Sequence, residues 1–286
     1  MVVKLKKEFP KYSVLMSVYY KEKPEWLSYS IESMLNQTVK PNEFVLVEDG
    51  PLTKKLDQVI DKFVKNNPKL FKIIKIKENG GLGPALKIGI ENCKNEFIAR
   101  MDSDDISVSN RCELQLTRFI NDKELDMIGA NHIEFIDSVD NPVAYKVLPS
   151  SFDDIKKYIK RRNPFSHSVV MYKKSAILEA GNYRNYYGLE DYDMWARMIL
   201  YKKKCENINA YLSYVRVGKD LYARRGGIKY LKSLLKFKKE LYKNGISSAK
   251  DYFVGSFAHV VVCLLPGGLR KKIYKKFLRE RVDILK

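Results

Sequence analysis

Three carboxylates within four residues are the part of this sequence best suited to chemistry. Asp102, Asp104 and Asp105 follow an apolar run, residues 97–101, that has the character of a buried strand. Carboxylates this close repel one another, and Mg²⁺ or Mn²⁺ would neutralise them while keeping coordination positions open for phosphate oxygens. The alternative is structural, with the aspartates lying on the approach to a helix that begins near Asn110. The residues alone leave both interpretations open.

A second acidic group lies in the stretch 188–195, GLEDYDMW. On a helix, the Leu, Met and Trp would pack inward, while Glu190 and Asp191 would lie in the first turn, where the helix dipole favours carboxylates. The functional interpretation is that such a carboxylate, facing a crevice, acts as a general base towards a hydroxyl. His167 is a third candidate, although an isolated His is more often a structural hydrogen-bonding residue.

The elements that must position these groups alternate along the chain. Apolar runs at 12–18, 42–47, 70–76 and 97–101 have strand character, and apolar residues at helical spacing fill the stretches between them. Four such alternations predict a parallel, doubly wound α/β sheet, whose ligand crevice lies at the carboxyl ends of the strands. Polar or glycine-rich residues follow each strand: Tyr19 and Tyr20, Glu48 and Asp49, Asn79 to Gly83, and Asp102 to Asp105.

The composition is that of a globular protein with an uneven charge distribution. The chain of 286 residues has a formal charge of +19 and is 45% hydrophobic. Residues 1–199 contain 31 basic and 28 acidic residues, whereas residues 200–286 contain 22 and 6. The four cysteines show no C-x-x-C spacing, so we expect free thiols.

The basic C-terminal stretch has the pattern of a membrane-surface segment. Leu231, Leu234, Leu235, Lys238 and Leu241 recur at helical spacing among lysines, an apolar run follows at 252–266, and a second basic amphipathic pattern covers 270–281. Such a segment suits an anionic membrane interface, where each nearby Lys or Arg adds about 1 kcal/mol. The alternative is a solvated charged face on ordinary packing helices. The apolar run is shorter than the roughly 20 residues that a spanning helix needs, and no nucleic-acid recognition motif is found.

Taken in order, these motifs resemble the inverting family-2 glycosyltransferases of GT-A fold. The resemblance covers about residues 12–200, and the ordered set is far more specific than any single motif. It is closest to the bacterial enzymes that extend O-antigen, capsule or exopolysaccharide units on an undecaprenyl-diphosphate carrier. The motifs are a tyrosine after the first strand, Glu48-Asp49-Gly50, Asn79-Gly80-Gly81-Leu82-Gly83, Ala99 to Asp105, His167, and Glu190 to Trp195.

The resemblance implies a GT-A-like, mostly parallel sheet with flanking helices, and a role for each site residue. The enzyme would move one hexose or N-acetylhexosamine from a UDP-sugar to a saccharide hydroxyl with inversion. Asp191 would be the base, and Asp102 and Asp104 would hold Mn²⁺ or Mg²⁺ on the donor diphosphate. Donor contacts would come from Ser17, Tyr19, Glu22, Asp49, Asn79, Gly81, Arg100, Asp102 and Ser103, and acceptor or supporting contacts from His167, Glu190 and Trp195.

Two departures from the family pattern refine this expectation. The second-strand motif commonly reads Asp-Asp-Gly-Ser but here reads Glu48-Asp49-Gly50-Pro51. This difference favours Asp49 over Glu48 for contact with the nucleobase of the donor. The Gln-x-x-Arg-Trp motif of processive members is missing, which favours addition of a single sugar.

We expect residues 1–215 to form the transferase domain and residues 216–286 to form a basic amphipathic helical segment. This segment would keep the protein peripheral on the cytoplasmic face of the inner membrane, where a lipid-linked acceptor is confined to two dimensions. Two alternatives stay open. One is a non-catalytic nucleotide-sugar or membrane-binding module of the same fold; the other is a nucleotidyltransferase, which would need a basic phosphate-binding loop after Val18.

Overall fold

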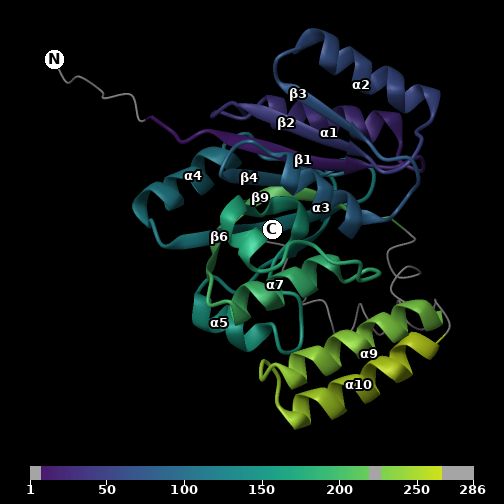
Figure 1. Cartoon of the computed structure of the whole chain (residues 1–286), viewed down its shortest axis with the longest axis vertical. Helices are drawn as coiled ribbons and strands as arrows, with labels where there is room; N and C mark the ends of the chain where they lie inside the picture. Colours follow the sequence, from purple (N-terminus) through teal and green to yellow (C-terminus); the bar gives the residue numbers. More distant parts are fainter. Residues whose placement is uncertain (1–7, 219–226, 266–286) are drawn as a thin grey trace.

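A nine-stranded sheet runs through the centre of the protein, in a computed structural model that describes residues 8–218 and 227–265 (Figure 1). Its strand order is β3-β2-β1-β4-β8-β6-β9-β5, with β7 paired to β6. The strands are β1 (Tyr12–Val18), β2 (Glu43–Glu48), β3 (Phe71–Lys75), β4 (Phe97–Asp102), β5 (Ile106–Ser107), β6 (Leu125–Phe135), β7 (Pro142–Lys146), β8 (Met171–Lys173) and β9 (Lys204–Arg216). The first four neighbours in this order are parallel, and β8 joins β4 in the antiparallel sense.

Helices cover both faces of the sheet, as Figure 1 shows. One face is covered by α1 (Pro24–Leu35), α2 (Lys54–Asn66) and α4 (Arg111–Asn121). The other is covered by α3 (Leu82–Asn92), α6 (Lys174–Glu179), α7 (Glu190–Leu200) and α9 (Gly227–Lys243). The shorter α5 (Phe152–Tyr158), the 3₁₀ turn η1 (His167–Val169) and α10 (Ala249–Leu264) complete the described elements. This arrangement confirms the predicted α/β class with a mostly parallel sheet and flanking helices.

The central strands are apolar on both sides because each side meets a helical layer. In β1, Leu15 packs in the cluster under α3 and α7, whereas Val14 and Met16 pack in the cluster under α1, α2 and α4. Gly89 of α3 permits a close approach on the first side, since a Cβ there would lie 2.4 Å from a methyl carbon of Leu15. The four strands predicted from apolar runs are therefore the four adjacent parallel strands.

The register of the parallel strands aligns their carboxyl ends. Ser17 of β1 lies opposite Asp102 of β4, and Val18 lies opposite Glu48 of β2. The loops that follow these strands therefore leave the sheet at a common edge, which is the expected position of a ligand crevice.

The two C-terminal helices, α9 and α10, lie side by side, with α9 on the side towards α7 (Figure 1). The side chains of Tyr230, Leu234, Phe237 and Leu241 on α9 are buried in the same core cluster as α7. The apolar side of α9 is therefore used inside the protein.

The neighbouring α10 differs from α9, because Phe253, Phe257 and Val261 are exposed along one side of it. In the part of the chain that the structure describes, no helix has the length and apolar character of a membrane span. The basic pattern at 270–281 lies outside the described residues. All four cysteines are buried free thiols, as expected.

Candidate active site

The carboxylate of Asp49, directly after β2, organises the glycine-rich loop that precedes α3. Its Oδ1 accepts a hydrogen bond from the Gly80 N–H at 2.8 Å, and its Oδ2 accepts from the Gly81 N–H and from Nδ2 of Asn79, both at 3.0 Å. Gly50 has φ +85°, and a Cβ there would lie 2.8 Å from the Asn79 nitrogen, so only glycine fits this turn. Asp49 thus holds the loop in a fixed position at the rim of the sheet.

The loop after β1 is joined to the loop after β4 across the strand ends. Glu22 accepts a hydrogen bond from the hydroxyl of Ser103. Tyr19 in the same loop is 38% exposed, and its ring meets that of Tyr20 edge to face. The structure therefore brings Tyr19, Glu22, Asp49 and Ser103, all predicted donor contacts, to one edge of the sheet.

The three aspartates after β4 have different surroundings. Asp102 is half-buried, and its Oδ2 pairs with the guanidinium of the buried Arg100. Asp105 is 2% exposed and accepts a hydrogen bond from the Arg216 N–H at 2.7 Å. Burial, followed by repulsion from Asp104 and Asp102, raises the pKa of Asp105 well above its usual range. Three carboxyl groups are therefore crowded at this rim, and a bound cation would relieve their mutual repulsion.

The carboxylate oxygens at this rim suit a divalent cation that binds together with a diphosphate. Asp102 uses Oδ2 for Arg100 and keeps a second carboxylate oxygen, and Asp104 is also half-buried rather than sealed in the core. Within residues 8–218 and 227–265, no three His, Cys, Asp or Glu side chains gather as a complete metal site. Mg²⁺ is usually bound by one or two carboxylates plus substrate phosphates, so two aspartates suffice for this kind of site.

Arg216, the last residue of β9, belongs to this rim although the sequence analysis did not select it. Its Nε donates to the carbonyl of Asp104 at 3.1 Å, and its guanidinium lies 4.4 Å from the ring centroids of both Trp26 and Phe135. The residue fixes the backbone of the aspartate loop and adds a positive charge beside it. The signal that could have found it is its position at the end of a strand, but β9 is not a continuous apolar run and lies wholly beyond the residues that carry the resemblance.

The second acidic group lies at the start of α7, as the sequence analysis predicted. Asp191 accepts a hydrogen bond from Nδ2 of Asn163 at 2.6 Å and one from the Tyr192 N–H at 2.7 Å. These contacts hold the carboxylate in one orientation. Its neighbour Glu190 is half-buried, and burial raises the pKa of Glu190 to about 7.

His167 and Trp195 lie behind the rim. Nε2 of His167 is 2.9 Å from the hydroxyl of Tyr183, and the indole of Trp195 packs edge to face on both rings. Burial, and then the charge of Arg100, lowers the pKa of His167 well below its usual range, so the imidazole is neutral at neutral pH. Trp195 is fully buried. Its place in the core makes it a support for His167 and α7.

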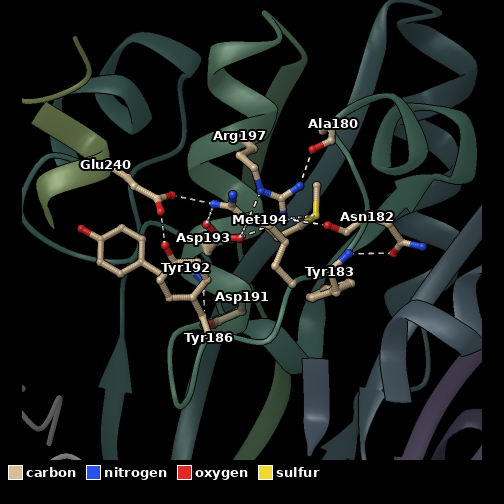
Figure 2. Close-up of polar contacts among 11 residues, drawn as sticks. Ala180, Asn182, Tyr183, Tyr186, Asp191, Tyr192, Asp193, Met194, Arg197 and Glu240 are labelled. Carbon is tan, nitrogen blue, oxygen red and sulfur yellow. Dashed lines mark hydrogen bonds and ion pairs between the residues drawn. The ribbon is translucent and has the colours of Figure 1, made fainter. Parts of the chain in front are cut away.

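A network of charges anchors α7 to its surroundings (Figure 2). Asp193, which is 1% exposed, accepts hydrogen bonds from Nε of Arg184 at 3.0 Å and from Nε of Arg197 at 3.1 Å. Arg184 also pairs with Glu240 of α9 at 2.8 Å, and the hydroxyl of Tyr186 donates to the same Glu240. The helix that carries Asp191 is thus joined to α9 by ion pairs through Arg184 as well as by core packing.

A cavity of about 760 Å³ extends from Asp102 and Asp105 at the rim to Asp191 at the start of α7. Asp102, Asp105, Asp191 and Arg216 line one part of it, and residues of η1, β6, α9 and α10 line the rest. Asp49 and the loop 79–81 are not among its lining residues. The cavity therefore lies on the side of the rim that faces the C-terminal helices.

Solved structures with the same fold are glycosyltransferases of GT-A type. One is the mannosyltransferase PcManGT from Pyrobaculum calidifontis in complex with GDP-Man and Mn²⁺, which has a TM-score of 0.63 and 13% identity and covers 92% of this chain and 72% of that one. Another is TarS 1–349 from S. aureus in complex with UDP-GlcNAc, with a TM-score of 0.61 and 16% identity over 94% of this chain and 71% of that one. At these identities the likeness shows the fold alone.

Sequence comparison defines the family. Residues 13–180 match Glycosyl transferase family 2. A relative from Escherichia coli, the UDP-Gal:alpha-D-GlcNAc-diphosphoundecaprenol beta-1,3-galactosyltransferase, is 35% identical over 95% of this chain and 98% of its own. The amylovoran biosynthesis glycosyltransferase AmsE of Erwinia amylovora is 34% identical over 93% of this chain and 98% of its own. The chain belongs to glycosyl transferase family 2, as the motifs predicted.

Proposed function

We propose that this glycosyltransferase moves one hexose or N-acetylhexosamine from a UDP-sugar to a hydroxyl of a lipid-linked saccharide, with inversion, in cell-surface polysaccharide synthesis. The observation that carries the proposal is that Asp102 of the aspartate rim and the oriented Asp191 line one cavity. Its full-length relative from E. coli is named for a UDP-sugar donor and a diphosphoundecaprenol acceptor, which supports this choice of substrates.

The donor would lie along the rim formed by the ends of β1, β2 and β4. Tyr19, Glu22, Asp49 and the loop 79–81 would contact the nucleoside, because they border the same edge of the sheet. Asp102 and Asp104 would hold Mn²⁺ or Mg²⁺, and this ion supplies electrostatic stabilisation of the negative charge that develops on the departing diphosphate. Arg100 keeps Asp102 oriented through their ion pair.

Asp191 would act as the general base. It is held by Asn163 at the start of α7, faces the cavity, and would take the proton from the acceptor hydroxyl as that oxygen attacks the anomeric carbon. A single in-line displacement with one base inverts the anomeric centre, whereas retention requires a second displacement. The raised pKa of Glu190 beside it would reduce the repulsion between the two carboxyl groups below about pH 7.

The test of this assignment is the Asp191→Asn variant. Transfer should fall by about 10³-fold or more, since proton removal is lost while the shape of the side chain is kept. UDP binding, measured by calorimetry with Mn²⁺, should stay within about twofold of the original protein. Undiminished transfer by this variant, assayed with a panel of UDP-sugars and diphosphate-linked acceptors, would remove Asp191 as the base.

Metal dependence has a separate test. The Kd of UDP should be lower with Mn²⁺ than with a chelator present. In Asp104→Asn, the ratio of these two Kd values should be at least about tenfold smaller. Asp140→Asn, at an exposed position on the β6–β7 turn, is the matched control. Equal UDP affinity with Mn²⁺ and with chelator would count against a metal at Asp102 and Asp104.

We also propose that the protein is peripheral at the inner membrane, with residues 216–286 as its docking segment. Phe253 and Phe257 on α10 are 66% and 74% exposed, on a chain region with a large excess of Lys and Arg. Exposed aromatic side chains beside basic ones suit an anionic bilayer surface. Phe253→Ser with Phe257→Ser should reduce co-sedimentation with phosphatidylglycerol vesicles, whereas Tyr29→Ser on α1 should not; equal co-sedimentation of both variants contradicts docking through α10.

A further inference from the structure

The cavity has one end rich in carboxyl groups and one end rich in basic side chains. The end at the strand rim carries Asp102, Asp105 and Asp191 together with Arg216. The end formed by α9, α10 and the segment before η1 carries Arg161, Arg162, Lys238 and Lys250, with Asp251 as the carboxylate beside them. The mechanism proposed above uses the first end and gives no role to the second.

Lys238 is the unusual member of the basic end. It lies on α9 and is 6% exposed, although lysine is almost never buried without a partner. None of the described residues accepts a hydrogen bond from its ammonium or forms an ion pair with it. Burial lowers the pKa of Lys238, and the charge of Asp251 partly opposes this shift. A largely buried ammonium gains from a further anionic partner, because desolvation disfavours its charged form.

The nearby carboxylate does not neutralise Lys238 directly. Asp251 accepts hydrogen bonds on Oδ2 from the hydroxyl and N–H of Ser248, closing the capping box of α10, and its Oδ1 pairs with Arg161 at 3.2 Å. Both oxygens of Asp251 are therefore in use. The net charge of this end of the cavity is positive.

The ammonium of Lys238 is held against the backbone of α10. A Cβ on Gly255 would lie 2.6 Å from its Nζ, so glycine leaves the space that the ammonium occupies. Next to Gly255, Val254 both lines the cavity and is 62% exposed. The basic end therefore continues directly into the exposed apolar side of α10.

We infer that Lys238, with Arg161, Arg162 and Lys250, binds the diphosphate that joins the acceptor saccharide to its lipid. This inference rests on the proposed function and assigns the acceptor side of the same cavity. A saccharide hydroxyl would lie at Asp191, the diphosphate at Lys238, and the beginning of the lipid chain along Val254 and the exposed side of α10. Lysine and arginine donate charge-assisted hydrogen bonds to phosphate oxygens, which would compensate the buried ammonium.

Direct binding tests the inference without any need for turnover. The full chain is titrated calorimetrically with octyl diphosphate in the presence of chelator, so that no metal draws the ligand to the aspartate rim. The original protein should bind it, and Lys238→Met should bind about tenfold more weakly or worse. Lys239→Met removes the same charge from an exposed position on the same helix and should bind like the original protein. Equal affinity of all three proteins overturns the inference.

A stability measurement and one further variant separate binding from folding. Lys238→Met should keep or raise the midpoint of thermal unfolding, because it replaces a buried unpaired charge by an apolar side chain of similar length. Gly255→Ala keeps the charge but fills the place of the ammonium, and it should also weaken octyl diphosphate binding severalfold. Wild-type affinity in Gly255→Ala would contradict the assigned position of the ammonium.

Transfer assays connect the inference to the enzyme. With a short-chain N-acetylglucosaminyl diphosphate lipid as acceptor, Lys238→Met should raise KM with little change in kcat; with an alkyl N-acetylglucosaminide that lacks the diphosphate, both proteins should have the same KM. Absence of transfer by the original protein to every member of a panel of diphosphate-linked acceptors and UDP-sugars would contradict the proposed function, whereas equal KM values for a diphosphate acceptor would contradict only the inference.

The phosphate that binds at Lys238 could alternatively belong to a phospholipid headgroup, and vesicle binding distinguishes this source from the acceptor diphosphate. Lys238→Met should co-sediment with phosphatidylglycerol vesicles as the original protein does. A loss of vesicle binding with unchanged octyl diphosphate affinity would overturn the inference in favour of a headgroup site.

Discussion

The strand-end rim and the helical pair α9–α10 use charged side chains in opposite ways. At the rim, polar groups are held mainly by one another: Asp49 holds the loop 79–81, Arg100 holds Asp102, and Arg216 holds the loop of Asp104. On α9 and α10, Lys238 is buried without a hydrogen bond or salt bridge to the described residues, and a row of apolar side chains on α10 is exposed among them. The rim is organised before any ligand arrives, whereas the described part of the helical pair has groups that a ligand or a surface could contact.

This difference has a functional meaning within the proposed reaction. A rigid rim suits the nucleotide-sugar donor, because preorganised dipoles stabilise the charge that develops on the departing diphosphate without reorganisation. An acceptor that combines a saccharide, a diphosphate and a lipid needs a polar, a cationic and an apolar contact in sequence. The described helical pair offers the last two next to each other.

The largest expected effect is the difference in stability loss between truncating a buried phenylalanine on α9 and an exposed one on α10. Phe237 of α9 is buried, with its ring 4.6 Å from that of Tyr192, whereas Phe257 of α10 is 74% exposed. Phe237→Ala should lower the free energy of unfolding by about 3–5 kcal/mol, since it leaves a cavity in the core. Phe257→Ala should change it by less than about 0.5 kcal/mol. Denaturant titrations of the two variants measure this contrast, and equal losses would show that α10 is also packed in the core.

The next effect concerns the ion pairs that join α7 to α9. Asp193→Asn should cost about 3 kcal/mol, because it leaves Arg197 and Arg184 without their buried carboxylate. Glu240→Gln alters only the more exposed end of the network and should cost no more than about 1 kcal/mol. Thermal unfolding of both variants is the measurement. A larger loss for Glu240→Gln would mean that the C-terminal helices, rather than Asp193, hold α7.

The smallest effect is a pH dependence of the stability, caused by Glu190 at the start of α7. Burial raises the pKa of Glu190 from about 4.5 to about 7, so the native state retains a proton that the unfolded state has lost between these values. This contribution to stability is present below about pH 4.5 and is lost as the pH rises through about 7. Glu190→Gln should therefore gain stability over the original protein between pH 5 and pH 8, on the order of 1–3 kcal/mol.

The control for this comparison is Glu25→Gln, at an exposed position on α1. Its stability difference from the original protein should stay constant over the same pH range. A constant difference for Glu190→Gln as well would show that the Glu190 carboxyl is ionised in the native state at pH 5.

The parts of the fold that sequence reasoning found are the ones with local signals. β1, β2, β3 and β4 read as continuous apolar runs because parallel strands between two helical layers are buried on both sides. The residues after these strands could be selected because ligands of such sheets bind at the carboxyl ends of the strands. β6 and β9 were not assigned, because their burial depends on pairing between segments about 80 residues apart.

The site was found in part for a similar reason. Asp102, Asp104 and Asp191 could be selected from residue type and spacing, and the structure brings Asp102 and Asp191 to one cavity. Arg216 and Lys238 could not be selected, because a single basic residue in a basic segment carries no local signal. Only burial and the identity of the neighbours distinguish Lys238 from Lys239.

The sequence by itself determined the class of fold, the family and the order of the motifs, since these follow from periodic burial and from residues adjacent in the chain. The tertiary structure decided which side of each C-terminal helix is covered, which lysine is buried, and that α9 and α10 form a wall of the cavity that contains Asp191. The physical reason is that burial and electrostatic pairing are set by contacts between distant segments, and no local pattern of residue types contains that information.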